Sequence, residues 1–163
     1  MSAAGWPWVT LSEMTVGGLL AAAMFAIAAT DWRHYRVPDT YTAFALLLRA
    51  VDVAFLPGVP GAALDTLLRA GVMAGLFYLF REGYRRWRGR EGLGLGDVKL
   101  AAVAGAWVEW RLLPYVIEIA ALAGLGVALL RVGAGLRGDT KLPFAVGFAP
   151  AIWIGWWLGR IGY

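Results

Sequence analysis

Six apolar runs follow one another along the chain, and this pattern constrains the fold more than any other feature. A helix that crosses the hydrocarbon core of a bilayer needs about 20 residues, so about six spans at most fit into 163 residues. The runs cover residues 16–30, 41–56, 62–80, 98–108, 115–130 and 144–158. The fourth run is too short to cross alone unless it begins at the preceding glycines and ends near Trp110.

The composition agrees with a chain that lies in lipid. Apolar residues make up 60% of the chain, charged residues only 16%, and the mean hydropathy is +0.64, which excludes a soluble globular domain. Without the alternation of a barrel, only helices satisfy the backbone over such lengths in lipid. We therefore expect an all-α, polytopic membrane helix bundle of about six spans. Residues 1–163 would form a single membrane-embedded domain.

The basic residues predict how the bundle is oriented, because Lys and Arg collect in cytoplasmic loops. If the N-terminus is outside, most of the 15 basic residues fall in inward loops, and six spans leave both termini outside. These inward residues are Arg33, Arg36, Arg81, Arg85, Arg86, Arg88, Arg90, Lys99, Arg131, Arg137 and Lys141. The net charge of +4 then reflects topology and anionic headgroups, and no nucleic-acid partner is expected.

The aromatic residues near the predicted outer ends are typical of an interfacial belt. We expect these to be Trp6, Trp8, Trp107, Trp110, Trp156, Trp157 and Tyr163. The chain has no Cys and one His, which excludes disulfides, thiolate metal sites, a cysteine nucleophile and most zinc sites.

Acidic residues at membrane depth are costly, so each is a functional candidate until a structural role explains it. Helical spacing predicts local ion pairs between Asp65 and Arg69 and between Arg49 and Asp52. Asp39 is expected to cap a helix together with Thr40. Glu82 and Glu91 stand beside arginines and Asp139 in a polar loop, where solvation explains them, whereas Glu118 remains a secondary candidate.

Two aspartates differ from the rest because the predicted topology places both on the cytoplasmic side. Asp31 ends the first apolar run, and Asp97 opens the fourth in the segment Gly-Leu-Gly-Asp-Val-Lys. Two carboxyl groups held close across one water share a proton, so one acts as acid while the other, as base, activates the water to attack an amide. Glycines before Asp97 permit close backbone approach and unusual conformations, so a substrate strand could lie there. The structural alternative makes Asp97 a helix N-cap and Asp31 a charge that sets topology.

At these residues the sequence resembles the type IV prepilin peptidases and archaeal preflagellin peptidases, which are membrane aspartic proteases of the GxGD class. Three patches match in order: residues 31–39, with an Asp, a basic stretch and Val-Pro-Asp; residues 94–100; and the late Pro-Phe segment at 142–150. The resemblance implies that Asp31 and Asp97 are catalytic, and that Gly94, Gly96 and Lys99 bind substrate. The late segment is spaced differently from the family pattern, so none of its residues is assigned to catalysis.

The resemblance also implies a substrate and a location. Family members remove the short basic leader of pilin-like precursors at the cytoplasmic border of the inner membrane, as multi-pass proteins that need no metal or cofactor. Many bacterial members carry a larger N-terminal portion with a Cys-rich loop that accompanies N-methylation. This chain resembles the short form, and methyltransferase activity is not expected. A homo-oligomer is compatible with the sequence but not indicated by it.

Two other functions fit the apolar pattern. A non-enzymatic assembly subunit of a pilus or secretion system would bind apolar helices without cutting them. A small transporter would use Asp31, Asp97 and Glu118 as proton or cation sites, yet two of these cluster on one predicted side of the membrane.

Overall fold

The computed structural model describes residues 11–55, 58–89, 92–133 and 143–162. This part of the chain contains six α-helices and no strand, which confirms the all-helical prediction. The helices are α1 (Leu11–His34), α2 (Asp39–Ala54), α3 (Val59–Arg88), α4 (Leu95–Trp107), α5 (Leu113–Gly133) and α6 (Ala145–Arg160). Each apolar run coincides with one helix or lies within it, to within two residues.

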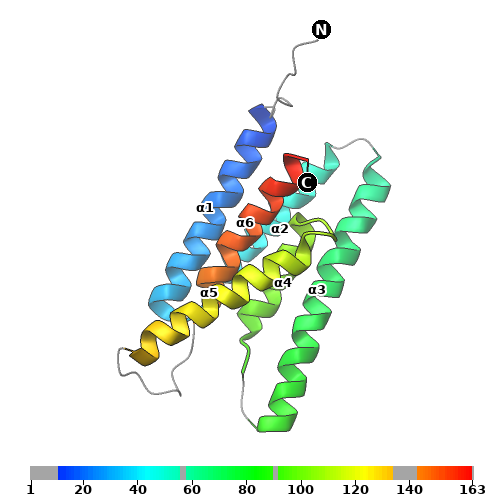
Figure 1. Ribbon diagram of the computed structural model, residues 1–163. Coiled ribbons are helices and arrows are strands. Elements are labelled where there is room, and N and C mark those ends of the chain that lie inside the picture. The colour runs from blue at the N-terminus through cyan, green and yellow to red at the C-terminus, as the bar shows by residue number, and fades with distance from the viewer. Residues whose placement is uncertain (1–10, 56–57, 90–91, 134–142, 163) are drawn as a thin grey trace.

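The helices run alternately down and up the bundle (Figure 1). The start of α1 and the end of α6 lie at the upper end, while the end of α1 and the starts of α2, α4 and α6 face the lower end. At the start of α3, Gly58 adopts a left-handed conformation with φ 75°, and Pro60 lies in the first turn of the helix. Helices α2 and α3 run antiparallel on either side of the Pro/Gly cluster, as predicted, and Pro57 of that cluster lies outside the described residues.

The short helix α4 lies inside the bundle. It packs along α3 and also contacts α2 and α6, and eight of its 13 residues are buried. Gly105 makes the close packing on α3 possible, because a Cβ there would lie 2.2 Å from the carbonyl oxygen of Arg69. At 1.5 Å per residue α4 is only about 20 Å long, less than a bilayer core, but protein surrounds it instead of lipid.

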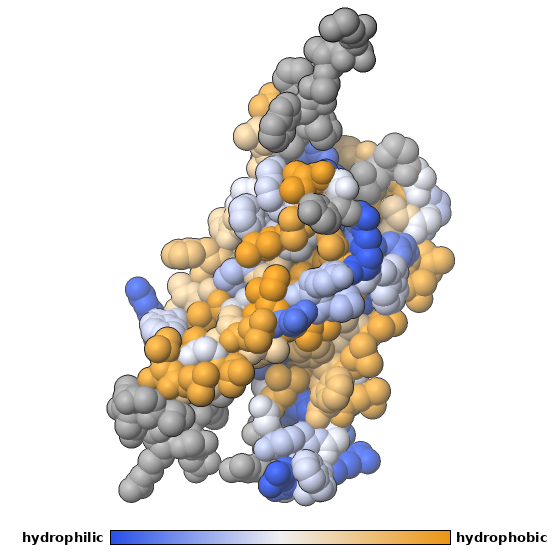
Figure 2. Space-filling model, in the orientation of Figure 1, coloured by the Kyte–Doolittle hydropathy of each residue, from blue (hydrophilic) through white to orange (hydrophobic). Residues whose placement is uncertain are grey.

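The outer surface is that of an integral membrane protein. Within the described residues, α1, α3 and Leu113–Leu130 of α5 are long and apolar enough to cross a membrane. Figure 2 shows apolar side chains along the flanks of the bundle and hydrophilic ones at the lower end of α3. On α3 alone, the exposed large apolar side chains include Leu64, Leu67, Val72, Leu79 and Phe80. An apolar surface of this extent needs a covering medium, which lipid supplies.

The charged stretch after the third apolar run is helical, whereas we expected a loop. Helix α3 continues to Arg88 and ends at Gly89, whose φ is 69° and whose N–H bonds the carbonyl of Arg85. Arg and Glu are good helix formers, so the helix continues where the apolar span stops. Glu82 supports this extension through ion pairs with Arg85 and Arg86. The predicted loop residues Arg90, Glu91, Arg137, Asp139 and Lys141 lie outside the described residues.

Two of the expected belt tryptophans are buried. Trp107 and Trp156 are each 3% exposed, and the Trp107 indole donates a hydrogen bond of 3.0 Å to the carbonyl of Ala45. The expectation was wrong for these two because both side chains point into the bundle interior. Trp110, at 48% exposure, is on the surface. Trp6, Trp8 and Tyr163 lie outside the described residues.

Candidate active site

Asp31 continues the buried face of α1. The buried residues of this helix recur every three or four positions, which is the period of one helix face: Gly17, Leu20, Ala23, Met24, Ile27 and Asp31. Asp31 is only 5% exposed. A carboxyl group therefore stands where the helix pattern calls for an apolar side chain, and it needs polar partners there.

The start of α6 supplies such a partner. Oδ2 of Asp31 accepts a hydrogen bond of 3.0 Å from the backbone N–H of Ala145. The first N–H groups of a helix have no partner within it and carry the positive end of the helix dipole, so they favour an anion. The backbone of Asp31 is anchored as well. Tyr35, in a left-handed conformation with φ 52°, donates its N–H to the Asp31 carbonyl at 2.9 Å.

Asp97 lies in the first turn of α4. Gly94 is the N-cap residue, and its N–H donates to Oδ2 of Asp97 at 3.2 Å, so Asp97 caps from the N3 position and is not itself the N-cap. Asp97 is half-buried, and it lies near enough to Asp31 for the two negative charges to interact. The end of α1 and the start of α4, which carry these two carboxyl groups 66 residues apart in the chain, lie at the same end of the bundle (Figure 1).

The glycines beside Asp97 act differently from our expectation. Gly94 has an ordinary extended backbone, with φ −73° and ψ 151°, and neither it nor Gly96 has a positive φ. The expected unusual conformation was therefore wrong. Gly96 instead permits close packing within the chain, because a Cβ there would lie 2.8 Å from the Cβ of Val37. The loop after α1 consequently rests directly on the start of α4.

Lys99 makes a second contact between α4 and the segment that follows α1, through an ion pair. Its Nζ lies 2.6 Å from Oδ1 of Asp39, and both side chains are exposed. Asp39 is the first residue of α2, whose N-cap is Pro38 and makes no side-chain cap hydrogen bond, so the predicted capping role of Asp39 was wrong. Gly96 and Lys99 thus contact the segment that follows Asp31.

Sequence reasoning did not assign Val37, Asp39 or Ala145 to the site. Val37 and Asp39 lie in the segment after Asp31, which matched the family pattern, and Ala145 lies in the late Pro-Phe segment. The match to the family pattern therefore pointed to these segments. The roles of the individual residues could not be predicted from it, because they depend on contacts between distant parts of the chain. In the described part of the chain, no group of three or more His, Cys, Asp or Glu side chains could hold a metal ion.

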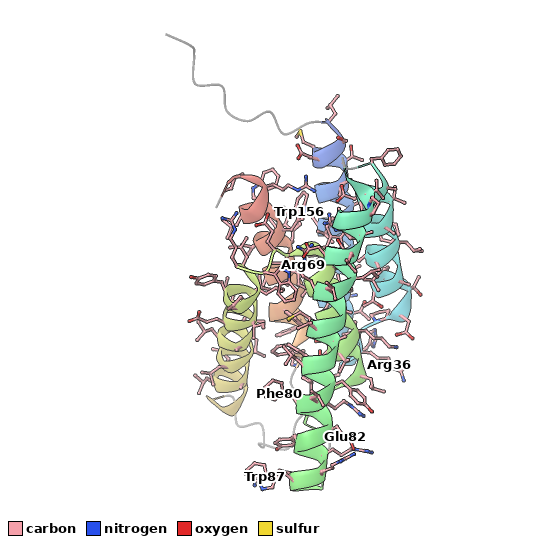
Figure 3. The ribbon with its side chains drawn as sticks, turned by 90° about the vertical axis from the view of Figure 1, so that its right-hand side faces the viewer. Arg36, Arg69, Phe80, Glu82, Trp87 and Trp156 are labelled. Carbon is pink, nitrogen blue, oxygen red and sulfur yellow. The ribbon has the colours of Figure 1, made fainter. Side chains whose placement is uncertain are left out.

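The other acidic candidates lie elsewhere. Asp52 and Asp65 form the predicted ion pairs with Arg49 and Arg69. Figure 3 shows Arg69 toward the upper end of the bundle, while Arg36 and Glu82 lie toward the lower end. Glu118 is exposed on α5. Asp31 and Asp97 therefore remain the two candidate carboxyl groups on helix ends that lie at the lower end of the bundle.

A family model described as the type IV leader peptidase family matches residues 18–129. A prepilin leader peptidase/N-methyltransferase of Burkholderia pseudomallei is 36% identical over 143 residues, which cover 83% of this chain and 45% of that relative. A protein of the same name from Pectobacterium carotovorum is 36% identical over 165 residues, with coverages of 98% and 55%. The Escherichia coli leader peptidase HopD is 35% identical over 120 residues, with coverages of 74% and 75%.

This chain thus spans about half the length of the first two relatives and three quarters of the third. No solved structure matches it. The matched segment begins in α1 before Asp31, contains Asp97 and extends into α5. The family match covers more than half of the residues, so the chain belongs to the type IV leader peptidase family.

Proposed function

We propose that this chain is a membrane aspartic endopeptidase of the GxGD type that removes the short basic leader of pilin-like precursors. Asp31 and Asp97 are the catalytic pair. The observation that carries this proposal is that the last turns of α1 and the first turn of α4 lie at the same end of the bundle, where Gly96 packs against Val37 of the loop after α1. A non-enzymatic assembly subunit is not favoured, because the matched family and relatives are peptidases by name.

The proposed reaction needs one proton shared by the two carboxyl groups. The ionised carboxylate takes a proton from a bound water, whose oxygen attacks the carbonyl carbon of the scissile amide. The protonated carboxyl group gives its proton to the carbonyl oxygen as that oxygen gains charge. The tetrahedral intermediate then collapses: the C–N bond breaks, the base gives the proton it took from water to the leaving amine, and a hydroxyl group of the intermediate returns a proton to the acid as the new carboxyl group forms.

The backbone hydrogen bonds of the two aspartates indicate which of them is the base and which is the acid. The α6 N-terminus donates to Asp31, which stabilises a negative charge there, and we assign the base to Asp31 and the acid to Asp97. Gly94 is exposed beside Asp97, so an extended substrate strand has access to the pair along this residue. Lys99 is exposed and Gly96 holds the start of α4 against Val37, so both would shape the same surface.

The proposed orientation places the aspartate end of the bundle at the cytoplasmic border of the inner membrane. The six helices then form one membrane-embedded domain of residues 1–163, with the short α4 enclosed by protein, and both termini lie outside. Arg33 and Arg36 after α1, and the arginines at the end of α3, support this orientation, because basic residues gather on the cytoplasmic side. The precursor's own apolar helix would insert alongside the bundle, with its leader in the cytoplasm.

The test is a co-expression cleavage assay. The precursor carries a short basic leader, a glycine at the cut and an apolar helix behind it, and cleavage is scored by the change in its mass. Asp31→Asn and Asp97→Asn each remove one carboxyl group at nearly constant volume and should abolish cleavage while the protein stays in the membrane. The matched control Glu82→Gln neutralises a carboxylate near the same end of the bundle and should leave cleavage intact. Retained cleavage in both Asp variants would reject the catalytic pair.

A further inference from the structure

Arginines from three helices converge at the end of the bundle opposite the aspartates. Arg49 of α2, Arg69 of α3 and Arg160 of α6 line one pocket of about 270 Å³. Arg49 and Arg69 are buried, at 9% and 6% exposure. Three guanidinium groups this close repel one another, so the pocket needs negative charge to be stable.

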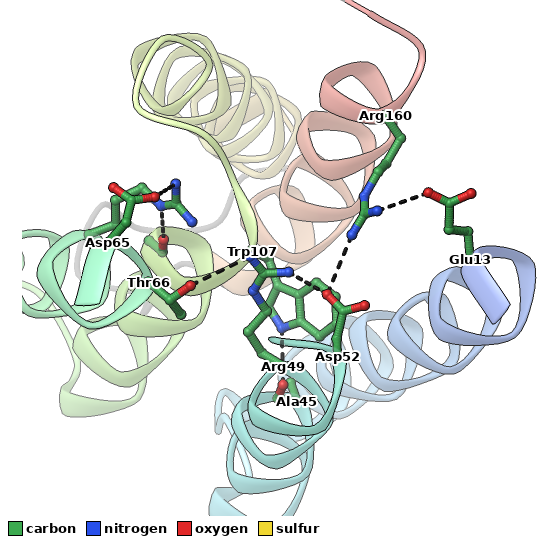
Figure 4. A network of polar contacts seen from close by, with 10 residues as sticks. Glu13, Ala45, Arg49, Asp52, Asp65, Thr66, Trp107 and Arg160 are labelled. Carbon is green, nitrogen blue, oxygen red and sulfur yellow. Dashed lines mark hydrogen bonds and ion pairs between the residues drawn. The ribbon is translucent and has the colours of Figure 1, made fainter. Parts of the chain in front are cut away.

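Each of the three arginines has one carboxylate partner, but these carboxylates differ in their burial and in how they are shared (Figure 4). Asp52 is shared, because it pairs with Arg49 and also lies 3.4 Å from Arg160. Arg160 reaches a second carboxylate, Glu13 at 2.9 Å, but Glu13 is 29% exposed and lies at the start of α1. One buried carboxylate therefore serves two arginines.

Two carboxylates line the pocket itself, and both already have a cationic partner, which for Asp65 is one of the pocket arginines. Asp65 pairs with Arg69 and accepts a hydrogen bond from the indole of Trp110, and its side chain is 45% exposed. Glu109 pairs with Arg111 and is 48% exposed. Both acids are thus solvated at the rim, whereas the arginine charge lies deeper.

Two buried hydrogen-bond donors of the pocket wall lack an acceptor. Within the described residues, neither Nε of Arg49 nor Nε1 of Trp156 has a hydrogen-bond partner, and Trp156 is only 3% exposed. Buried polar groups are nearly always satisfied, so unmet donors indicate a missing acceptor. Both residues belong to the same pocket, which makes one multivalent acceptor the simplest answer.

Aromatic rings hold the arginines in place around this space. The guanidinium of Arg49 lies over the ring of Trp107 at 5.5 Å, and that of Arg160 lies over the ring of Trp156 at 5.6 Å. Such stacking orients guanidinium groups without neutralising them. Ala62 and Gly155 add apolar wall. The pocket thus combines fixed cationic donors with an apolar lining, as a site for an amphipathic anion requires.

We propose that this pocket binds the phosphate group of an anionic phospholipid from the adjacent leaflet. A phosphate offers several acceptor oxygens, which match the fork of a guanidinium and can also take the Trp156 indole proton. Arg69 and Trp156 of the pocket lie toward the upper end of the bundle (Figure 3), and the flanks of the bundle are apolar (Figure 2), so lipid headgroups would gather near this end. A lipid phosphate can occupy it while its chains lie along those flanks.

The test uses the purified full chain in neutral detergent, with short-chain phosphatidylglycerol, short-chain phosphatidylcholine or inorganic phosphate as probes. Phosphatidylglycerol should raise the melting temperature in a saturable manner, and native mass spectrometry should show one bound lipid per chain. Phosphatidylcholine, whose choline meets the arginines with like charge, should bind at least several-fold more weakly. Inorganic phosphate should give a smaller shift at equal concentration, because it gains nothing from the apolar wall.

The deciding variant is Trp156→Phe, which keeps an aromatic ring and removes the unpartnered indole N–H together with the five-membered ring that carries it. Loss of one hydrogen bond to a charged group should weaken phosphatidylglycerol binding roughly tenfold. The matched control Trp157→Phe, one position along α6 and outside the pocket lining, should bind as the unchanged protein does. Arg160→Lys keeps the positive charge and loses the bidentate guanidinium, so it should independently weaken phosphatidylglycerol binding.

Three results would overturn the proposal. The first is equal binding by Trp156→Phe and Trp157→Phe. The second is equal stabilisation by phosphatidylcholine and phosphatidylglycerol. The third is stabilisation by inorganic phosphate that matches that of phosphatidylglycerol, which would assign the pocket to the free ion.

Discussion

The carboxylate of Asp31 accepts a hydrogen bond from the backbone N–H of Ala145, 114 residues further along the chain. This contact joins the last turns of α1 to the first turn of α6. It places a buried negative charge at the positive end of a helix dipole, which offsets part of the cost of burying that charge. The proposed catalytic base is therefore held by the fold itself.

The first prediction separates the structural role of Asp31 from its proposed catalytic role. Asp31→Ala leaves the Ala145 N–H buried without an acceptor and should lower the free energy of unfolding by about 1–3 kcal/mol. Asp31→Asn keeps an acceptor oxygen and removes the buried charge, so it should be clearly more stable than Asp31→Ala. Denaturant unfolding in micelles measures both. Equal stability of the two variants would mean that the bond to Ala145 contributes nothing.

The second prediction concerns the seam between α3 and α4. Gly105→Ala puts a Cβ 2.2 Å from the Arg69 carbonyl oxygen, and because backbone cannot move aside cheaply, the helices must separate. We expect a loss of at least about 1–3 kcal/mol, the usual cost of overpacking.

The matched control is Gly71→Ala on α3, where nothing lies within 4 Å of the added Cβ. This change should be neutral or stabilise the helix slightly, because Ala is the better helix former. Melting temperatures of the two variants in the same detergent decide the point. If Gly105→Ala melts no lower than Gly71→Ala, the close contact between α3 and α4 is wrong.

The six helices were predictable because each carries an apolar run long enough to be recognised without knowledge of its neighbours. The ends of the helices were not predictable, because an apolar run shows which residues lie in lipid and a helix can continue beyond them. The segment to Arg88 shows this: its Arg and Glu side chains favour helix as strongly as the apolar residues before them. Apolar content also does not reveal which way a side chain points, so the buried Trp107 and Trp156 were misplaced at the interface.

The candidate site likewise contains residues that the sequence predicts and residues that only the structure identifies. Asp31 and Asp97 were found because two acids at the ends of apolar runs are rare and costly. The roles of Val37, Asp39 and Ala145 depend on contacts between distant segments, which no local pattern encodes. Gly96 illustrates the limit: the need for a glycine was foreseen, but the reason is the close approach of Val37 and not an unusual backbone angle.

The third prediction tests that close approach. Gly96→Ala places a Cβ 2.8 Å from the Cβ of Val37, which pushes the start of α4, and Asp97 with it, away from the loop after α1. Small displacements of catalytic groups are costly, so leader cleavage should fall by roughly 10 to 100 fold.

The compensating change is Val37→Gly, which removes the Cβ that the new side chain meets. The double variant Val37→Gly/Gly96→Ala should regain cleavage relative to Gly96→Ala, whereas Val37→Gly alone reports the cost of the lost side chain. Cleavage rates for all four proteins complete the cycle. Absence of any recovery in the double variant would show that the contact with Val37 is not what makes Gly96 necessary.

The last prediction concerns the exposed ion pair between Lys99 and Asp39. Exposed pairs add little to stability, so Lys99→Glu should leave the melting temperature nearly unchanged. It sets two negative charges against each other, two residues from Asp97, and should therefore loosen the loop from α4 and slow cleavage several-fold. The exchanged pair Asp39→Lys/Lys99→Glu restores the attraction and should recover most of the rate. Because salt screens exposed charges, the defect of Lys99→Glu should also shrink at high ionic strength. A double variant no faster than the slower single variant would show that Lys99 acts on the substrate directly and not through Asp39.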